Sequence, residues 1–277
     1  MNKLAIFQNK VAIVTGGASG LGRALCAELV PLGAAKVVVA DINEPRAQQV
    51  AEELGPRACA RAVDVTQPAQ VEALVEGVVT EFGRLDYMFN NAGITICGEV
   101  RDMQAEHWQR ILAVNLWGVI YGTQAAYAVM LRQGSGHIVN TASLDGLAPM
   151  PMSAPYTAAK HGVVGLSTAL RLEALELGVR VSVACPGAIR TEVFDKALFV
   201  GVDAEAVRRE MLTEFKLIDP AESARGILRG VARNQSIILD APHNHLLWWI
   251  HRLSPGLYGR LMGVGVRFVR KHRLAQA

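Results

Sequence analysis

Seven apolar runs of strand length recur along this chain, and stretches with helical patterning separate them. The runs cover residues 11–15, 36–41, 60–65, 85–90, 137–142, 179–185 and 236–240. Strands that alternate with helices predict a parallel sheet, because each parallel strand needs a long crossover to bring the chain back. The runs are almost continuously apolar, so we expect helices to cover both faces of that sheet. The pattern therefore predicts a doubly wound α/β fold.

The composition fits one packed domain. The chain has 277 residues, of which 51% are hydrophobic and 19% charged, and this is enough for one large core or two smaller ones. No proline- or glycine-rich linker divides residues 1–240, so we expect one domain there and an extension over residues 241–277. No uninterrupted apolar run of about 18 residues is present, and the first strand begins too early to leave room for a secretory signal. We therefore expect a cytoplasmic protein.

The four cysteines give no sign of a disulfide framework or a metal site. Cys26, Cys59, Cys97 and Cys185 are widely spaced, with no CxxC pair and no neighbouring histidine in a zinc-like pattern. We expect them to be reduced thiols in the core, and we expect no bound metal.

The stretch TGGASGLG, residues 15–22, lies between the first strand and a helical pattern. A loop at this place must turn sharply and bring its backbone against a ligand, and Gly16, Gly20 and Gly22 suit both demands because a β-carbon would obstruct them. A pyrophosphate would then lie at the positive amino terminus of the helix. The spacing is GxxxGxG, not the commoner GxGxxG, and a purely structural turn is the alternative.

Asp41 ends the second expected strand, 19 residues after Gly22. A carboxylate there can accept hydrogen bonds from both hydroxyls of an adenine ribose and would repel a 2′-phosphate, so we infer NAD over NADP. Two alternatives remain open. Asp41 is a solvated residue at a strand end in the first, and Arg23 serves the phosphate of NADP in the second.

The segment YTAAK places Tyr156 and Lys160 four residues apart, on one face of an expected helix. A phenol has a reference pKa of about 10, and a neighbouring ammonium favours its ionised form. We therefore expect Lys160 to lower the pKa of Tyr156, which could then act as an acid or base near neutral pH. Ser143 follows the fifth strand, where open α/β sheets place their ligand crevice. Asn115 is a polar residue within a long apolar helix, for which a kink or a core hydrogen bond is the simpler explanation.

Together these motifs resemble the classical short-chain dehydrogenase/reductase family (SDR). They occur in family order and cover roughly residues 8–240. The matching elements are TGGASGLG, Asp64 with Val65, NNAG at residues 90–93, Asn115, Ser143, YTAAK, and the PG that precedes Thr191. The resemblance implies a Rossmann-type sheet of about seven strands in the order 3-2-1-4-5-6-7.

The resemblance also implies a role for each matching residue. Tyr156 would exchange a proton with the substrate oxygen, and Ser143 would hold that oxygen near the nicotinamide. Lys160 would bind the nicotinamide ribose, and Asn115 would hold a water that links Lys160 to solvent. The positions implied for cofactor binding are Thr15, Gly16, Ser19, Gly20, Leu21, Gly22, Asp41, Ile42, Asp64, Val65, Asn91, Ala92, Gly93, Tyr156, Lys160, Pro186, Gly187, Ile189 and Thr191. Family members usually pair through their two long helices, which implies a homodimer or homotetramer.

Family practice places substrate specificity after Ser143 and after Gly187. The residues there are mostly apolar and predict a hydrophobic secondary alcohol or its ketone as the substrate. Ser143, Leu144, Met150, Met152, Tyr156 and Phe194 are the expected substrate contacts. Asp145 is the one charged residue nearby, and we interpret it as a solvated turn residue, with contact to a substrate hydroxyl as the alternative.

The extension over residues 241–277 is basic. It carries six arginines and lysines and no aspartate or glutamate. From Pro255 its pattern predicts a basic amphipathic helix, and Trp248 and Trp249 before it would suit a membrane interface. The alternative is a helix that packs over the substrate cleft or on a neighbouring subunit. We do not expect nucleic-acid binding, because the rest of the chain lacks a basic stripe.

These features favour an NAD-dependent oxidoreductase that interconverts a hydrophobic secondary alcohol and its ketone. Two other hypotheses remain. The first is an NADPH-dependent carbonyl reductase. The second, from a different class of protein, is a membrane-associated dinucleotide-binding module in which interactions through the extension matter more than catalysis.

Overall fold

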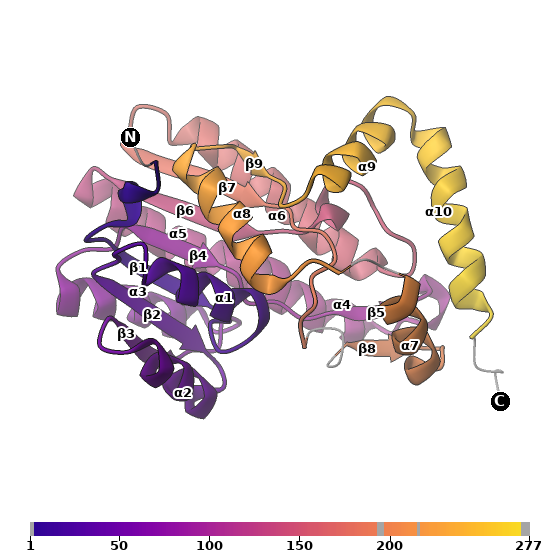
Figure 1. The fold of residues 1–277 in the computed structure, drawn as a ribbon, viewed down its shortest axis with the longest axis horizontal. Coiled ribbons are helices and arrows are strands. Elements are labelled where there is room, and N and C mark those ends of the chain that lie inside the picture. Colours follow the sequence, from indigo (N-terminus) through magenta and orange to yellow (C-terminus); the bar gives the residue numbers. More distant parts are fainter. Residues whose placement is uncertain (1–2, 193–196, 215–216, 273–277) are drawn as a thin grey trace.

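Seven parallel strands form the central sheet of the protein (Figure 1), as seen in a computed structural model that describes residues 3–192, 197–214 and 217–272. Their order across the sheet is β3-β2-β1-β4-β6-β7-β9. The strands are β1 (Val11–Thr15), β2 (Lys36–Asp41), β3 (Ala58–Ala62), β4 (Tyr87–Asn90), β6 (Gly136–Thr141), β7 (Val179–Ala184) and β9 (Ile237–Ile238). This arrangement confirms the α/β class and the expected strand order.

Two details of the sheet differ from the sequence expectation. Strand β3 covers Ala58–Ala62, whereas the apolar pattern pointed to residues 60–65. In addition, β5 (Ile96–Gly98) and β8 (Leu198–Val200) form a separate parallel pair that the sequence did not predict. Each has three residues and a partner about a hundred residues away. Such a pair depends on contacts between distant segments, and these contacts leave no pattern in the local sequence.

Helices cover both faces of the main sheet. Successive residues of β1 point to opposite faces, with Ala12 and Val14 in one core cluster and Val11 and Ile13 in the other. Both sets are buried, which explains why the strands read as continuous apolar runs. The first cluster takes residues from α1, α2 and α8, and the second from α3, α5 and α6. The helices are α1 (Gly20–Leu29), α2 (Glu44–Leu54), α3 (Pro68–Phe82), α4 (Ala105–Leu112), α5 (Gly118–Gln133), α6 (Ala154–Glu173), α7 (Ala204–Glu214) and α8 (Pro220–Ala232).

The carboxyl-terminal extension forms α9 (Pro242–Leu253) and α10 (Pro255–Arg270), which extend from one end of the domain (Figure 1). In α9, Asn244 is 2% exposed and donates a 2.8 Å hydrogen bond to Asp240. In α10, Tyr258 is 4% exposed and donates a 3.1 Å hydrogen bond to the carbonyl oxygen of Pro149. The extension therefore packs on the same domain, next to the segment that follows Ser143.

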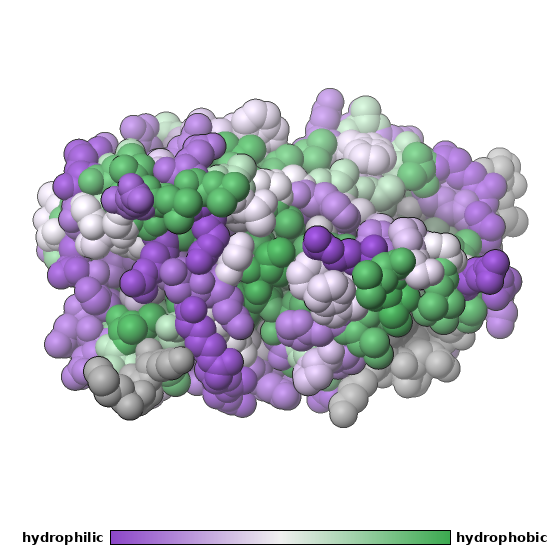
Figure 2. Space-filling model, turned by 90° about the horizontal axis from the view of Figure 1, so that it is seen from above, coloured by the Kyte–Doolittle hydropathy of each residue, from purple (hydrophilic) through white to green (hydrophobic). Residues whose placement is uncertain are grey.

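This helix pair leaves several apolar side chains exposed. Six of its side chains are between 44% and 76% exposed, and the view from above shows apolar residues beside polar ones at this end of the molecule (Figure 2). They are Leu246, Trp249, Leu253, Leu257, Leu261 and Val264. None of the helices in the described part of the chain is long and apolar enough to span a membrane.

Tyr258 provides a test of how the extension is held. Replacing Tyr258 with Phe removes the hydroxyl alone and should lower the free energy of unfolding by about 1 kcal/mol. Replacing it with Ala also removes the buried ring and should cost about 3 kcal/mol. Urea unfolding of the purified variants measures both. Leu253→Ala is the control, since Leu253 is 76% exposed on the same extension and its loss should matter little. A Tyr258→Ala protein as stable as the unchanged one would contradict this packing.

Candidate active site

The loop between β1 and α1 accepts only glycine at its key positions. Gly16 and Gly20 have φ angles of +65° and +51°, which side-chain-bearing residues rarely adopt. A β-carbon at Gly22 would lie 2.1 Å from the carbonyl oxygen of Gly16, and one at Gly20 would lie 3.1 Å from Thr191. The loop is thus a cradle that β-carbons would fill, at the amino terminus of α1. Its shape fits the pyrophosphate of a dinucleotide that we expect there from the sequence. The proximity of the loop to Thr191 is a finding of the structure.

Asp41 lies at the edge of this cradle. One carboxylate oxygen accepts a 3.1 Å hydrogen bond from the amide of Ala18, and the other accepts a 3.0 Å bond from the amide of Asn43. The carboxylate is therefore held against the glycine loop. The next residue, Ile42, is 73% exposed. Arg23, the alternative ligand for a 2′-phosphate, instead forms a 2.6 Å ion pair with Glu53.

Thr15 connects the glycine loop to the end of β4. Its hydroxyl accepts hydrogen bonds from the amides of Asn91 and Ala92, at 2.9 and 3.1 Å. The side chain of Asn91 donates a 3.0 Å bond to the carbonyl oxygen of Thr15. These three expected cofactor residues therefore hold one another, and they fix the backbone on which Gly93 lies.

Asp64 and Val65 hold the turn before α3. One carboxylate oxygen of Asp64 accepts bonds from the amide and the hydroxyl of Thr66, at 2.9 and 2.8 Å. Val65 is 9% exposed, and its side chain would lie 2.9 Å from a β-carbon at Gly118. These contacts give both residues a structural role, and their contact with an adenine stays a prediction.

Asn115 lies in a π-helical turn, Ala113–Trp117, between α4 and α5. Residues 105–133 are helical without a break, so Asn115 lies within one long helix as expected, and the π-turn distorts that helix. The side chain is fully buried and makes two 2.8 Å hydrogen bonds with the backbone of Ile94, accepting from its amide and donating to its carbonyl oxygen. From the sequence, a helix distortion or a core hydrogen bond is the simpler explanation of Asn115, and the structure contains both. Such π-turns are frequent at functional sites.

Lys160 is a buried cation at the centre of the site. It is 3% exposed, and its ammonium donates a 2.8 Å hydrogen bond to the carbonyl oxygen of Thr141, at the end of β6. The ammonium nitrogen lies 5.6 Å from the centre of the Tyr156 ring. A β-carbon built at Gly93 would lie 3.8 Å from the same nitrogen, so Gly93 is next to the ammonium group. Burial lowers the pKa of Lys160 to about 8, because the charged form is poorly solvated there.

Tyr156 projects from the same face of α6, and its hydroxyl hydrogen-bonds with Ser143. The sequence led us to expect a lowered pKa for this phenol, and that expectation was wrong for the ligand-free chain. Burial raises the pKa of Tyr156, and the carboxylate of Asp145 raises it further, whereas the hydrogen bond with Ser143 lowers it. Desolvation of the phenolate outweighs the favourable contact.

Asp145 is a partly buried member of the site, not the solvated turn residue that we inferred from the sequence. Its carboxylate accepts a 3.0 Å hydrogen bond from the hydroxyl of Ser153, and its amide donates a 3.2 Å bond to the hydroxyl of Ser143. Burial raises the pKa of Asp145 to about 6. Asp145 is therefore a hydrogen-bond acceptor next to Ser143. The sequence did not indicate this, because no local pattern shows that other parts of the chain bury this turn.

The segments after β6 and β7 close the site. The amide of Leu144 donates a 2.8 Å bond to the carbonyl oxygen of Pro186, and the amide of Gly187 donates a 3.1 Å bond to Asp240. Ile189 pairs with Ile218 in an isolated bridge. Three expected cofactor residues, Pro186, Gly187 and Ile189, thus lie together beside the Ser143 segment.

The expected substrate contacts have different surroundings. Leu144 is 6% exposed and packs in one cluster with Tyr258 of α10. The sulfur of Met150 lies 3.6 Å from the hydroxyl of Tyr258. Met152 has a φ of +63°, and its carbonyl oxygen accepts a 2.8 Å bond from the amide of Gly98. Phe194 lies outside the described residues.

Tyr258 and Asn244 are residues of the extension that sequence reasoning did not connect with the site. Tyr258 contacts the segment after Ser143, and a β-carbon at Gly187 would lie 2.5 Å from Asn244. Gly187 and Asn244 are 57 residues apart, so no local sequence pattern could connect them. Only the tertiary structure brings them into contact. Within the described ranges, no group of three or more His, Cys, Asp and Glu side chains is placed to hold a metal ion.

The comparisons with known proteins agree with this geometry. The family model for short chain dehydrogenase matches residues 10–198. A putative oxidoreductase, SadH, from Mycobacterium tuberculosis is 34% identical over 269 residues, which cover 95% of this chain and 97% of that protein. A cyclohexanol dehydrogenase from an Acinetobacter species is 42% identical over 191 residues, covering 67% of this chain and 75% of that enzyme.

A solved structure shares the fold over nearly the whole chain. It is a short chain dehydrogenase/reductase from Burkholderia phymatum in complex with NAD, with a TM-score of 0.83 and 29% identity, covering 91% of this chain and 95% of its own. The family model spans well over half of the sequence, and it includes the glycine loop, Asn115, Ser143, Tyr156 and Lys160. The chain belongs to the short-chain dehydrogenase/reductase family.

Proposed function

We propose that the protein is an NAD-dependent oxidoreductase that interconverts a hydrophobic secondary alcohol and its ketone. The observation that carries this proposal is the group formed by Tyr156, Ser143 and the buried Lys160 at the carboxyl edge of the sheet. A phenol, a hydroxyl and an ammonium placed together can bind a substrate oxygen and move a proton to or from it. The family to which the chain belongs, whose members oxidise alcohols or reduce ketones, supports the same reaction type.

The residues around the glycine cradle would hold the cofactor. The backbone from Gly16 to Gly22 fits the pyrophosphate, Asp41 would accept hydrogen bonds from the adenine ribose, and Lys160 would bind the nicotinamide ribose. When bound, NAD supplies the carbon that accepts hydride from the alcohol. The ammonium of the buried Lys160 is held in position by its hydrogen bond to the carbonyl oxygen of Thr141.

Tyr156 and Ser143 would act on the substrate oxygen. In the oxidation direction, the phenolate oxygen of Tyr156 takes the hydroxyl proton, and the hydroxyl of Ser143 donates a hydrogen bond to the same substrate oxygen. Burial raises the pKa of Tyr156, and a neighbouring cation would act in the opposite direction by stabilising the phenolate. The ammonium of Lys160 lies 5.6 Å from the centre of the Tyr156 ring. Asn115 would position a water for proton relay from Lys160, as family resemblance implies.

The NADPH-dependent carbonyl reductase is the weaker alternative. Asp41 places a carboxylate where a 2′-phosphate would need a cation, and Arg23 is already paired with Glu53. The NAD complex of the structural relative from Burkholderia phymatum supports the same preference.

The substrate class rests on the apolar side chains near Ser143. Met150 and Met152 are partly exposed and offer hydrocarbon and thioether surface, and a relative that covers two thirds of the chain is named for a cyclic secondary alcohol. We propose a homodimer or homotetramer through α5 and α6. Exposed apolar residues on and after these helices, such as Leu172 and Leu175, at 70% and 64% exposure, support that assembly.

Tyr156→Phe tests the acid/base role. This variant should keep its affinity for NADH and lose turnover by about a thousandfold, because the ring remains and the exchangeable proton is gone. NADH formation with NAD and a panel of cyclic, aliphatic and aryl secondary alcohols measures turnover, and NADH fluorescence measures binding. Tyr127→Phe, the same change in a tyrosine that packs on the core, is the control and should stay active. A Tyr156→Phe enzyme with full turnover would rule out this role.

Asp41→Asn tests the cofactor preference. Loss of the carboxylate removes charge-assisted hydrogen bonds to the ribose and the repulsion of a 2′-phosphate, so the ratio of NAD to NADP affinity should fall about tenfold. Fluorescence titration with NADH and NADPH gives both constants. Glu44→Gln removes one charge from the exposed first turn of α2 and should leave the ratio unchanged. Equal ratios in the Asp41→Asn and unchanged proteins would contradict the NAD preference.

The exposed apolar side chains of α9 and α10 favour a second proposal, peripheral contact with an anionic membrane. Leu253 and Leu257 are two of these side chains, and residues 241–277 contain no acidic residue that would neutralise the basic ones. The protein should co-sediment with phosphatidylcholine vesicles that contain phosphatidylglycerol and not with phosphatidylcholine alone, and the double variant Leu253→Glu, Leu257→Glu should lose this binding. Equal binding by that variant would contradict the proposal.

A further inference from the structure

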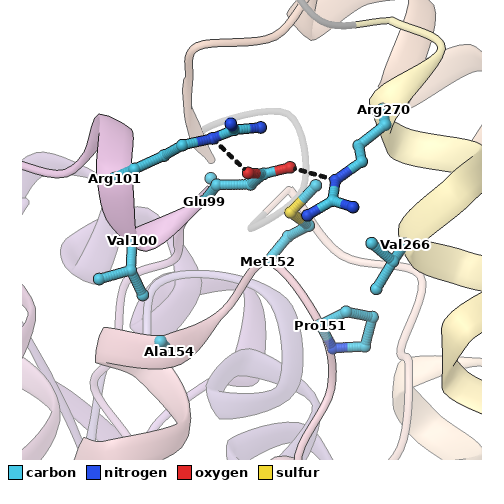
Figure 3. Close-up of a pocket in the computed structure, with 9 residues that line it drawn as sticks. Glu99, Val100, Arg101, Pro151, Met152, Ala154, Val266 and Arg270 are labelled. Carbon is cyan, nitrogen blue, oxygen red and sulfur yellow. Dashed lines mark hydrogen bonds and ion pairs between the residues drawn. The ribbon is translucent and has the colours of Figure 1, made fainter. Parts of the chain in front are cut away.

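A cavity lies beside the candidate active site, between α10 and the start of α6. It has a volume of about 430 Å³ and is drawn in Figure 3. Three segments that are distant in the sequence supply its walls. They are residues 98–101 at the end of β5 and after it, Pro151, Met152 and Ala154 before and at the start of α6, and Val266 with Arg270 of α10.

Two arginines and one glutamate form the rim of this cavity. The side chains of Arg101 and Arg270 approach Glu99 from opposite sides (Figure 3), with the Nε atoms 2.6 and 2.7 Å from its two carboxylate oxygens. Glu99 is 13% exposed, whereas the two arginine side chains are 55% and 56% exposed. The arginines therefore hold the pKa of Glu99 below its usual range, and the trio carries a formal charge of +1.

The contacts with Glu99 hold both guanidinium groups in place, and they include the Nε atom of each arginine. The terminal nitrogens of Arg270 point toward Met152, which lines the cavity (Figure 3). A guanidinium presents a planar fork of donors that matches a carboxylate in a bidentate arrangement. A net charge of +1 matches one singly charged carboxylate better than a doubly charged phosphate.

The remaining walls of the cavity are apolar. Val100, Pro151, Met152, Ala154 and Val266 contribute hydrocarbon or thioether surface. A site with an apolar wall and a cationic rim selects a ligand that has an apolar chain and an anionic end.

The cavity is close to the reacting groups. Ala154 of its wall lies in the first turn of α6, as does Tyr156. Gly98 of another wall follows Cys97, whose thiol is close enough to Tyr156 to raise the pKa of that phenol. The hydrogen bond from the amide of Gly98 to the carbonyl oxygen of Met152 fixes the wall between the cavity and the segment after Ser143. An elongated substrate whose alcohol carbon lies at Tyr156 could extend along this wall to the arginine rim.

We propose that this cavity binds the distal end of the substrate and that this end is a carboxylate on an apolar chain. This inference rests on the proposed oxidation of a secondary alcohol, and it narrows the substrate class to hydrophobic hydroxy acids and their keto acids. Arg270 and Arg101 are the residues that determine this specificity, and α10 thereby becomes part of the substrate site.

A binding experiment tests the cavity independently of any turnover. Isothermal titration calorimetry of the full-length protein in the presence of NAD should show octanoate binding more tightly than octanol. Arg270→Gln and Arg101→Gln should each weaken octanoate binding about tenfold and leave octanol binding unchanged. Arg267→Gln is the matched control, because it removes the same charge from α10 outside the cavity lining. Equal octanoate affinity in the Arg270→Gln and unchanged proteins, or an equal loss in Arg267→Gln, would overturn the site.

A kinetic experiment tests whether this ligand is the substrate. Hydroxy fatty acids of graded length, with the alcohol next to the terminal methyl group, are compared with their methyl esters. At the best length, kcat/KM should be about tenfold higher for the acid, and Arg270→Gln should abolish this ratio while turnover of the ester persists. Equal kcat/KM for acid and ester would overturn the substrate assignment. If neither acids nor esters were oxidised, the proposed function would fail, and the calorimetric result would still decide the cavity.

Discussion

The parallel arrangement of the main sheet is the constraint on which the rest of the structure depends. Parallel strands all end at the same edge, so Thr15, Asp41, Asn90 and Thr141 come together although they are far apart in the sequence. Each anchors a part of the candidate site, and the ends of β1 and β6 hold the loop with Asn91 and the ammonium of Lys160. An antiparallel pairing of the same strands would place these groups at opposite edges.

Burial decides the electrostatics of the site. Lys160 is enclosed with one hydrogen bond to the backbone, which lowers its pKa, while Tyr156 and Asp145 have raised pKa values for the same reason. Desolvation thus disfavours the charged form of all three groups.

The extension changes the character of the substrate side. Tyr258 is buried against the segment after Ser143, and Arg270 pairs with Glu99 next to β5, so α10 joins two loops that line the site. Residues beyond the family model thus pack against the segment that follows Ser143. The same helices keep several apolar side chains exposed.

The sequence by itself determined the parallel sheet, the glycine loop and the set formed by Ser143, Tyr156 and Lys160. These features follow from local apolar runs and short motifs whose spacing is fixed by a strand or a helix, whereas the strand order came from the family resemblance that the motifs carry. Only the tertiary structure decided the π-turn at Asn115, the pairing of β5 with β8, the direction of the Tyr156 pKa and the contacts of the extension. Each of these depends on burial or on partners distant in the chain, and neither leaves a periodic signal in the sequence.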